Sequence, residues 1–158
     1  MINNKLIKPN SIVVVGGSND IRKPGGKILK NLTDGKFAGD LYVVNPKENE
    51  VQGLPCYKSV DELPHTDMAI LAIAAKYCPQ TVEILARQKE TRAFIIISAG
   101  FSEENEAGAK LEEEVVDIID SVGGSLIGPN CVGMFNTHHH GVFTTPIPKT
   151  DPNGVDFI

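Results

Sequence analysis

The sequence predicts a Rossmann-like α/β fold, a doubly wound parallel sheet of about five to seven strands with helices on both faces. The first observation is a series of short, β-branched apolar runs without alternation, which is typical of strands covered on both faces. The second is that segments with helical spacing of apolar residues lie between these runs. The third is the chain itself, whose 158 residues, 41% hydrophobic and 22% charged, suit one globular domain.

The predicted strands and helices alternate along the chain. Strands are expected at Ser11–Val15, Asp40–Val44, Met68–Ile73, Ala93–Ile97 and Ser125–Ile127. Helices are expected over residues 27–32, 79–89 and about 106–122, where apolar residues recur at helical spacing. Ser102 is a candidate N-cap for the last of these helices. The alternation predicts right-handed crossovers and a doubly wound sheet.

The C-terminal part of the sequence does not follow this pattern. Regular patterning ends after Gly133, and prolines punctuate a polar stretch that closes at residues 151–154. Residues 155–158 then resemble the start of a strand. We expect residues 1–150 to form the domain, and 151–158 to begin a linker or a second domain that this chain lacks. An added edge strand of the same domain fits the tail equally well.

Composition argues against several classes of protein. The net charge of −5 argues against a nucleic-acid partner. No apolar run approaches the roughly 18 residues that cross a bilayer, and the N-terminus has no apolar signal core. We therefore expect a cytoplasmic protein without a membrane partner. The three cysteines, Cys56, Cys78 and Cys131, include no CxxC pair, so we expect reduced thiols and no zinc site.

The loop after the first predicted strand is rich in glycine and lies in a basic part of the chain. Residues 1–58 hold nine basic and five acidic side chains, whereas residues 59–158 hold six and fifteen. Gly16 would allow a tight turn, and Gly25 and Gly26 would let the backbone approach a phosphate before the helix begins. Ser18 and Ile21 stand where the dinucleotide motif G-x-G-x-x-G requires glycine. The loop could therefore bind a small polyanion other than a dinucleotide, or be a purely structural turn.

The residues that follow two other strands narrow the choice of ligand. Lys47 follows the second strand, where a site for nicotinamide dinucleotides has an acidic residue. A lysine attracts a phosphate and does not bind a ribose diol, although a solvated lysine is the alternative. Cys131 follows the fifth strand and is either a nucleophile or, as is commoner for an unpaired cysteine, a small buried residue.

Three consecutive histidines occupy positions 138–140. In an extended segment only His138 and His140 could share an ion, and no partner carboxylate stands at metal-site spacing. We therefore expect a packed or solvated loop at these residues, and no metal bound by this domain.

Several motifs, taken in order, are more specific than any one of them. They are Ser11–Ser18, Asn31-Leu32, Phe37–Gly39, Val44–Lys47, Val51–Tyr57, Ser98–Glu103 and Gly128–Gly133. Over about residues 8–148 the chain closely resembles the CoA-binding domain of ADP- or NDP-forming acyl-CoA (acetyl-CoA) synthetases, a family related to the succinyl-CoA synthetase α-subunit. The resemblance implies a ligase that converts a carboxylic acid, CoA and ATP to acyl-CoA, ADP and phosphate through an acyl-phosphate and a phosphohistidine.

The resemblance also implies that different domains carry out different parts of the reaction. The phosphohistidine and nucleotide-grasp domains of the family have no counterpart in this chain, so the chain alone would be inactive. Its partners would be CoA and the remaining ligase domains, or a partner subunit with a nucleotide-grasp fold. No catalytic residue is expected here. The CoA-binding residues carried over by motif are Gly16, Gly17, Ser18, Asn19, Asp20, Lys47, Ile73, Ala74, Ala75, Ser98, Ala99, Gly100, Asn130 and Cys131.

Among these residues, the resemblance implies three regions of contact with CoA. Lys47 would reach the nucleotide end of CoA, residues 98–100 would line the pantetheine path, and Asn130 and Cys131 would lie near the thiol. Ala74 departs from the family, which commonly has proline there. Two other interpretations remain: a stand-alone, non-catalytic CoA-binding protein that senses a metabolite, and an NAD(P)-binding oxidoreductase domain suggested by fold analogy alone.

Overall fold

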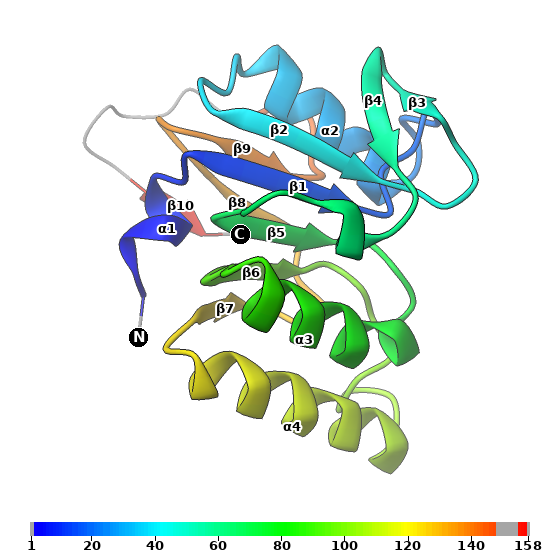
Figure 1. Cartoon of the computed structure of the whole chain (residues 1–158), viewed down its shortest axis with the longest axis vertical. Helices are drawn as coiled ribbons and strands as arrows, with labels where there is room; N and C mark the ends of the chain where they lie inside the picture. The colour runs from blue at the N-terminus through cyan, green and yellow to red at the C-terminus, as the bar shows by residue number, and fades with distance from the viewer. Residues whose placement is uncertain (1, 148–154, 158) are drawn as a thin grey trace.

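The computed structural model describes residues 2–147 and 155–157 of the chain and confirms the predicted Rossmann-like α/β class. The large sheet has seven strands, six of them linked by parallel pairings (Figure 1). Their spatial order is β3 (Glu50–Val51), β4 (Leu54–Tyr57), β2 (Asp40–Val44), β1 (Ser11–Val15), β5 (Met68–Leu71), β6 (Ala93–Ile96) and β7 (Ser125–Ile127).

Strand β1 lies at the point where the direction of winding reverses. It pairs in parallel with β2 on one side and with β5 on the other. In open α/β sheets the ligand crevice forms at such a switch point, outside the carboxyl ends of the strands. These ends point to the right in Figure 1. The short strands β3 and β4, which the sequence analysis missed, form an antiparallel hairpin beside β2 at the same edge.

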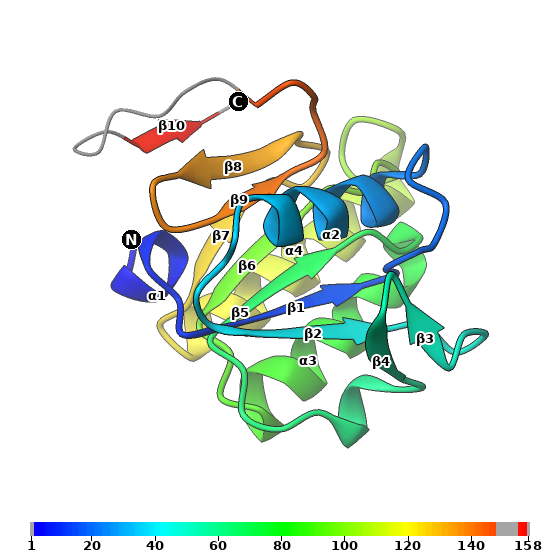
Figure 2. The same ribbon diagram turned by 90° about the horizontal axis from the view of Figure 1, so that it is seen from above.

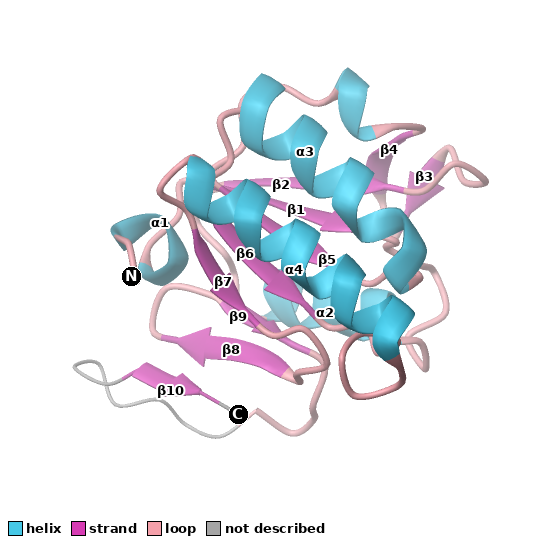
Figure 3. Cartoon of the chain, turned by 90° about the horizontal axis from the view of Figure 1, so that it is seen from below, coloured by secondary structure: helices cyan, strands magenta, loops and turns pink. Residues whose placement is uncertain are grey.

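Helices cover the two faces of the sheet (Figure 2). One face carries α2 (Pro24–Asp34), and the other carries α3 (Cys78–Gln88) and α4 (Glu106–Ser121), which lie side by side in Figure 3. Ile12 and Val14 of β1 belong to the core under α2, whereas Val13 and Val15 belong to the core under α3 and α4. All four side chains are at most 4% exposed, which explains why this run is apolar without alternation.

The expectation that regular structure ends after Gly133 is wrong. A small antiparallel sheet of β8 (Gly133–Asn136), β9 (His140–Val142) and β10 (Val155–Phe157) lies on the α2 side of the molecule (Figure 2). The side-chain amide of Asn31 in α2 donates to Val142 O at 2.6 Å, which attaches β9 to the helix. These strands have only three or four residues each, too few to show a periodic pattern.

The tail is described only in part. Residues 155–157 pair with β8, while residues 148–154 and 158 lie outside the described part of the chain. The domain boundary proposed at residue 150 therefore stays a prediction. No helix within the described residues is long and apolar enough to cross a membrane.

Several local predictions need correction. Strand β5 ends at Leu71 rather than Ile73, and α2 begins at Pro24 rather than at residue 27. The N-cap of α4 is Asn105, whose Oδ1 accepts the N–H of Gly108 at 2.9 Å, and not Ser102. Three short helices were not predicted, namely α1 (Asn4–Ile7), η1 (Val60–Glu62) and η2 (Ala75–Tyr77).

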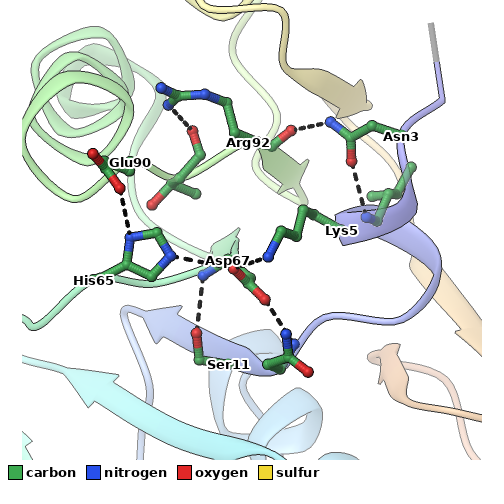
Figure 4. A network of polar contacts seen from close by, with 10 residues as sticks. Asn3, Lys5, Ser11, His65, Asp67, Glu90 and Arg92 are labelled. Carbon is green, nitrogen blue, oxygen red and sulfur yellow. Dashed lines mark hydrogen bonds and ion pairs between the residues drawn. The ribbon is translucent and has the colours of Figure 1, made fainter.

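A polar network closes the opposite, amino-terminal edge of the sheet (Figure 4). Asp67, 3% exposed, accepts the Lys5 ammonium at 2.6 Å and the Asn10 N–H at 2.8 Å, and its own N–H donates to Ser11 Oγ at 2.9 Å. His65 lies 3.3 Å from the same carboxylate. The network joins α1 to the starts of β1 and β5, at the edge away from the carboxyl ends of the strands.

Candidate functional site

The turn after β1 brings the chain against the end of β5. Gly16 has a φ of +86°, in the left-handed region that favours glycine. A Cβ at Gly16 would lie 2.4 Å from Ala72 O, and a Cβ at Gly17 would lie 2.4 Å from Val43 Cγ1. Only glycine fits both positions without movement of a neighbour, so this pair seats the loop at the switch point of the sheet.

The polar side chains of this loop are engaged within the protein. Ser18 Oγ accepts the Asp20 N–H at 3.0 Å. The Asp20 carboxylate receives two hydrogen bonds from the Arg22 guanidinium, at 2.9 and 3.0 Å, and these lower the pKa of Asp20 to about 2. Asp20 is therefore ionised, but its charge is paired with Arg22. The loop does not present an unpaired negative charge to a phosphate.

The glycines at the start of α2 have a packing role that the sequence did not indicate. A Cβ at Gly25 would lie 2.1 Å from Gly16 O, and a Cβ at Gly26 would lie 2.2 Å from Asp20 O. Both residues are buried. Their missing side chains let the helix pack against its own preceding loop, which by itself requires glycine there; the close approach to a phosphate stays a prediction.

Asn45 connects this loop to the end of β2. Its side-chain amide donates to Gly17 O at 2.8 Å, and its Oδ1 accepts the Lys47 N–H at 2.9 Å. The side chain of Lys47 is exposed and borders a cavity of about 580 Å³. This cavity is lined by Val15, Val44, Pro46, Lys47, Lys58, Ser59, Val60, Asp61, Ile73, Tyr77, Gln80, Thr81 and Ile84.

A second cavity of about 310 Å³ lies at the same edge of the sheet. Its lining residues are Pro24, Ala72, Ile73, Ile97, Ser98, Ala99, Asn130, Cys131, Val132 and Phe143. Ile73 borders both cavities. Six predicted site residues thus surround one or both spaces: Lys47, Ile73, Ser98, Ala99, Asn130 and Cys131.

The other predicted site residues do not line these cavities. Residues 16–20 form the loop beside them, and Ala74 precedes η2. Ala75 is buried, and its Cβ would lie 3.2 Å from a Cβ at Gly100. The structure therefore places Ala75 in the packing between the loops after β5 and β6.

Hydrogen bonds link the ends of β5, β6 and β7. Ser98 Oγ donates to Ile73 O, and the Asn130 N–H donates to Ser98 O at 3.0 Å. Cys131 Sγ lies 3.4 Å from Ile96 O, and burial raises the pKa of its thiol. The thiol is accordingly protonated near neutral pH, which fits a packing role and not that of an activated nucleophile.

The loop after β6 is held by a carboxylate that the sequence analysis did not single out. Glu103 Oε1 accepts the Gly100 N–H at 2.6 Å, and both carboxylate oxygens lie within 3.3 Å of the Phe101 nitrogen. These backbone hydrogen bonds lower the pKa of Glu103. Gly100 has a φ of +105°, so the backbone and this carboxylate together determine the shape of the loop.

The side chains of the three histidines lie in three different environments. His138 borders a cavity with Lys8 and Asn10, whereas His140 Nδ1 would lie 2.4 Å from a Cβ at Gly35. His139 is 2% exposed, and its Nε2 lies 3.0 Å from Leu6 O. Burial lowers its pKa to about 4, so it is neutral at pH 7. Within the described ranges, no group of three or more His, Cys, Asp or Glu side chains could hold a metal ion.

Sequence reasoning missed Lys58, Tyr77 and Gln52 at this edge. Lys58 follows β4, and Val44 of β2 pairs with Tyr57 of β4, so Lys47 and Lys58 leave adjacent strand ends. Recognition of the strand at 54–57 would have identified Lys58 as a candidate. Gln52 lies in the turn between β3 and β4, where the motif Val51–Tyr57 was the only signal.

The fold, the glycine turn at the switch point and the two cavities define a Rossmann-like ligand-binding domain. Comparison with known families makes this class specific. The family described as the CoA binding domain matches residues 10–137, so the chain belongs to the CoA-binding domain family. This match does not favour an NAD(P)-dependent oxidoreductase.

Known relatives support the same assignment. The chain is 44% identical over 134 residues to an ADP-forming acetate–CoA ligase of Archaeoglobus fulgidus, covering 84% of this chain and 19% of that protein. It is also 44% identical to the α-subunit of an ADP-forming acetate–CoA ligase of Pyrococcus furiosus, covering 84% of this chain and 29% of that subunit.

A solved structure shows the same similarity in three dimensions. The dinucleotide-forming acetyl-coenzyme A synthetase 1 of Ca. Korarchaeum cryptofilum, in complex with phosphate and ADP, superposes with a TM-score of 0.80 at 31% identity. The match covers 88% of this chain and 30% of that one. The chain therefore spans less than a third of the length of each of these three relatives.

Proposed function

We propose that this chain binds CoA along the carboxyl edge of its large sheet and serves as the CoA-binding part of an ADP-forming acyl-CoA ligase. The observation that carries the proposal is the pair of cavities that share Ile73 in their linings, one bordered by Lys47 and the other by Asn130 and Cys131. Membership in the CoA-binding domain family supports CoA as the occupant.

The two cavities differ in a way that suits the two ends of CoA. Lys47 and Lys58 are both exposed on the larger cavity, where together they outweigh the carboxylate of Asp61, and CoA carries a 3′-phosphate and a pyrophosphate at its nucleotide end. Lysine side chains are point charges suited to phosphate. The smaller cavity is lined mainly by apolar and small side chains such as Ile73, Ala99 and Val132, which suits the uncharged pantetheine arm. In this orientation the thiol lies toward Asn130 and Cys131.

The reaction of the whole ligase requires more than this chain. Relatives with ADP-forming acetate–CoA ligase activity are several times longer. We propose that this chain holds CoA with its thiol exposed, while further ligase domains or a partner subunit with a nucleotide-grasp fold activate the carboxylic acid with ATP. The products of the complete reaction are acyl-CoA, ADP and phosphate. No residue of this chain is assigned a catalytic role.

Calorimetric titration with CoA and with dephospho-CoA tests both the ligand and its orientation. The unchanged chain should bind CoA, and Lys47→Ala should weaken CoA binding about tenfold, the typical effect of losing one charge-assisted phosphate contact. Dephospho-CoA lacks the 3′-phosphate, so its affinity should change far less. Lys110→Ala, on the exposed surface of α4, is the control and should bind both ligands normally.

Two results would count against this account in different ways. A folded chain that does not bind CoA, either alone or joined to the remaining ligase domains, would contradict the proposed function. Equal losses of CoA and dephospho-CoA affinity in Lys47→Ala would contradict only the assignment of Lys47 to the 3′-phosphate.

A further inference from the structure

The hairpin of β3 and β4 contains a motif to which the proposed function gives no role. Its turn consists of Gln52 and Gly53, with φ values of +51° and +82°. Two consecutive left-handed residues are typical of the tight turns that join antiparallel strands. The register, with Val51 opposite Leu54, confirms a two-residue connection. The turn therefore places the Gln52 side chain at a defined position beside the loop after β1.

Gln52 makes three hydrogen bonds to this neighbouring segment. Its Nε2 donates to Ser18 O and to Gly26 O, each at 2.8 Å, and its backbone N–H donates to Asn19 Oδ1, also at 2.8 Å. Asn19 in turn donates from Nδ2 to Glu50 O at 3.2 Å. One carboxamide thus satisfies carbonyl groups at both ends of the loop between β1 and α2.

The chemistry of these contacts makes the side chain specific. Ser18 O and Gly26 O can only accept hydrogen bonds, and the primary amide of glutamine supplies two N–H donors from one nitrogen. Both carbonyl oxygens lie 2.8 Å from the same Gln52 nitrogen, so they face one space. A carboxylate of the same shape would place oxygen against oxygen. A shorter amide could not reach both acceptors from the same turn.

We propose that the loop at residues 17–20, which lies beside the two cavities, contacts the phosphates of CoA, and that Gln52 is a positioning residue that holds this loop in the conformation that does so. The inference rests on the proposed function, because it assigns a cause to the shape of the same site. Gln52 itself lines neither of the two cavities at this edge. It acts through Ser18, Asn19 and Gly26, to which its hydrogen bonds run.

The variants Gln52→Glu and Gln52→Asn test this proposal together. The first keeps the length of the side chain but replaces its two donors, and the second keeps an uncharged amide that tolerates positive φ but is too short. Both should weaken CoA and dephospho-CoA by the same factor, about tenfold, since the loop and not the 3′-phosphate contact is affected. Gly53→Asn is the matched control, because a Cβ at Gly53 meets nothing within 4 Å and asparagine tolerates the positive φ of +82° better than most other side chains.

Hydrogen exchange of the ligand-free chain gives a readout that does not depend on CoA. The amides of residues 17–20 should exchange faster in Gln52→Asn than in the unchanged chain, while Gly53→Asn leaves them unchanged. If the unchanged chain did not bind CoA, the proposed function would fail, and the exchange rates alone would decide whether Gln52 holds the loop.

Three results would overturn the inference. The first is CoA affinity and exchange rates in both Gln52 variants equal to those of the unchanged chain. The second is an equal loss of affinity in Gly53→Asn, which would mean that general stability of the hairpin matters and not the side-chain contacts. The third is failure of both Gln52 variants to fold by circular dichroism, which would make Gln52 a folding determinant.

Discussion

At the scale of single residues, His139 shows how burial selects one protonation state. Its Nε2 faces Leu6 O and its Nδ1 lies 3.3 Å from the Gly141 nitrogen, an N–H donor. A carbonyl can only accept, so the ring is neutral with its proton on Nε2. The consecutive histidines indicated a packed or solvated loop, and His138 and His139 do lie in the β8–β9 loop, whereas His140 begins β9. Sequence could not identify which of the three is buried.

The stability of the fold should depend on pH through this residue. The pKa of His139 is lowered from 6.5 to about 4, so the unfolded chain binds the proton more readily than the folded one. The free energy of unfolding is therefore unaffected by the titration of His139 above about pH 6.5. It decreases as the pH falls toward 4, by at most about 3 kcal/mol. Urea unfolding at pH 7, 6, 5 and 4.5 should show this decline.

A pair of variants isolates the contribution of His139. His139→Gln should reduce the slope of unfolding free energy against pH between 6.5 and 4, although the variant is less stable at every pH. His138→Gln changes an exposed ring that contributes only a minor part of the lowered pKa of His139, so this variant should keep nearly the full slope. His140, whose pKa is also lowered by burial, contributes equally in all three proteins. The same slope in His139→Gln as in the unchanged chain would contradict this assignment.

At the scale of elements, the ends of helices were harder to predict than their existence. The apolar stripe of α4 is a local property of its sequence, so the helix itself could be predicted. Its N-cap depends on which of several polar residues adopts extended backbone, and Asn105 does so with a φ of −170°. The first turn of α2 contains Gly25 and Gly26, which have no side chains and so show no helical periodicity. Their place in the helix depends on tertiary contacts with the preceding loop.

Removal of the α4 cap gives a test at this scale. Asn105→Ala leaves the Gly108 N–H without its side-chain acceptor and should lower the free energy of unfolding by about 1 kcal/mol. Ser102→Ala, which leaves this cap intact, is the comparison and should be close to neutral. Thermal unfolding followed by circular dichroism at 222 nm measures both. A larger loss for Ser102→Ala than for Asn105→Ala would show that the cap has been misassigned.

At the scale of the whole molecule, stability and ligand binding are located at opposite edges of the sheet. The network around Asp67 joins α1, β1 and β5 at the amino edge (Figure 4), while the two cavities that we propose for CoA lie at the carboxyl edge. Burial by itself raises the pKa of Asp67, yet the hydrogen bonds from Lys5, Asn10 and His65 hold it below its ordinary value. The carboxylate is therefore ionised and stabilises the fold at neutral pH.

Because the two edges are separate, we expect a variant at the amino edge to lose stability and to keep its affinity for CoA. Asp67→Asn replaces one acceptor oxygen by a donor beside Lys5 or Asn10 and should cost about 2 kcal/mol of unfolding free energy. Its CoA affinity at 15 °C should stay within about twofold of the unchanged chain, since distant sites behave independently. Urea unfolding and calorimetry measure the two quantities. A parallel loss of affinity would show that the two edges are coupled.

The sequence by itself determined the Rossmann-like class, the five main strands, the family and six of the residues that border the cavities. These follow from local patterns, since burial on both faces selects continuous apolar runs, and from motifs next to strand ends. Only the tertiary structure placed Lys58 near Lys47 at adjacent strand ends and packed Gly25 and Gly26 against the preceding loop. It also decided the β8–β9 hairpin and the hydrogen bonds of Gln52. The physical reason is distance along the chain: Gln52 and Ser18 are 34 residues apart, and only the folded sheet brings them within a hydrogen bond.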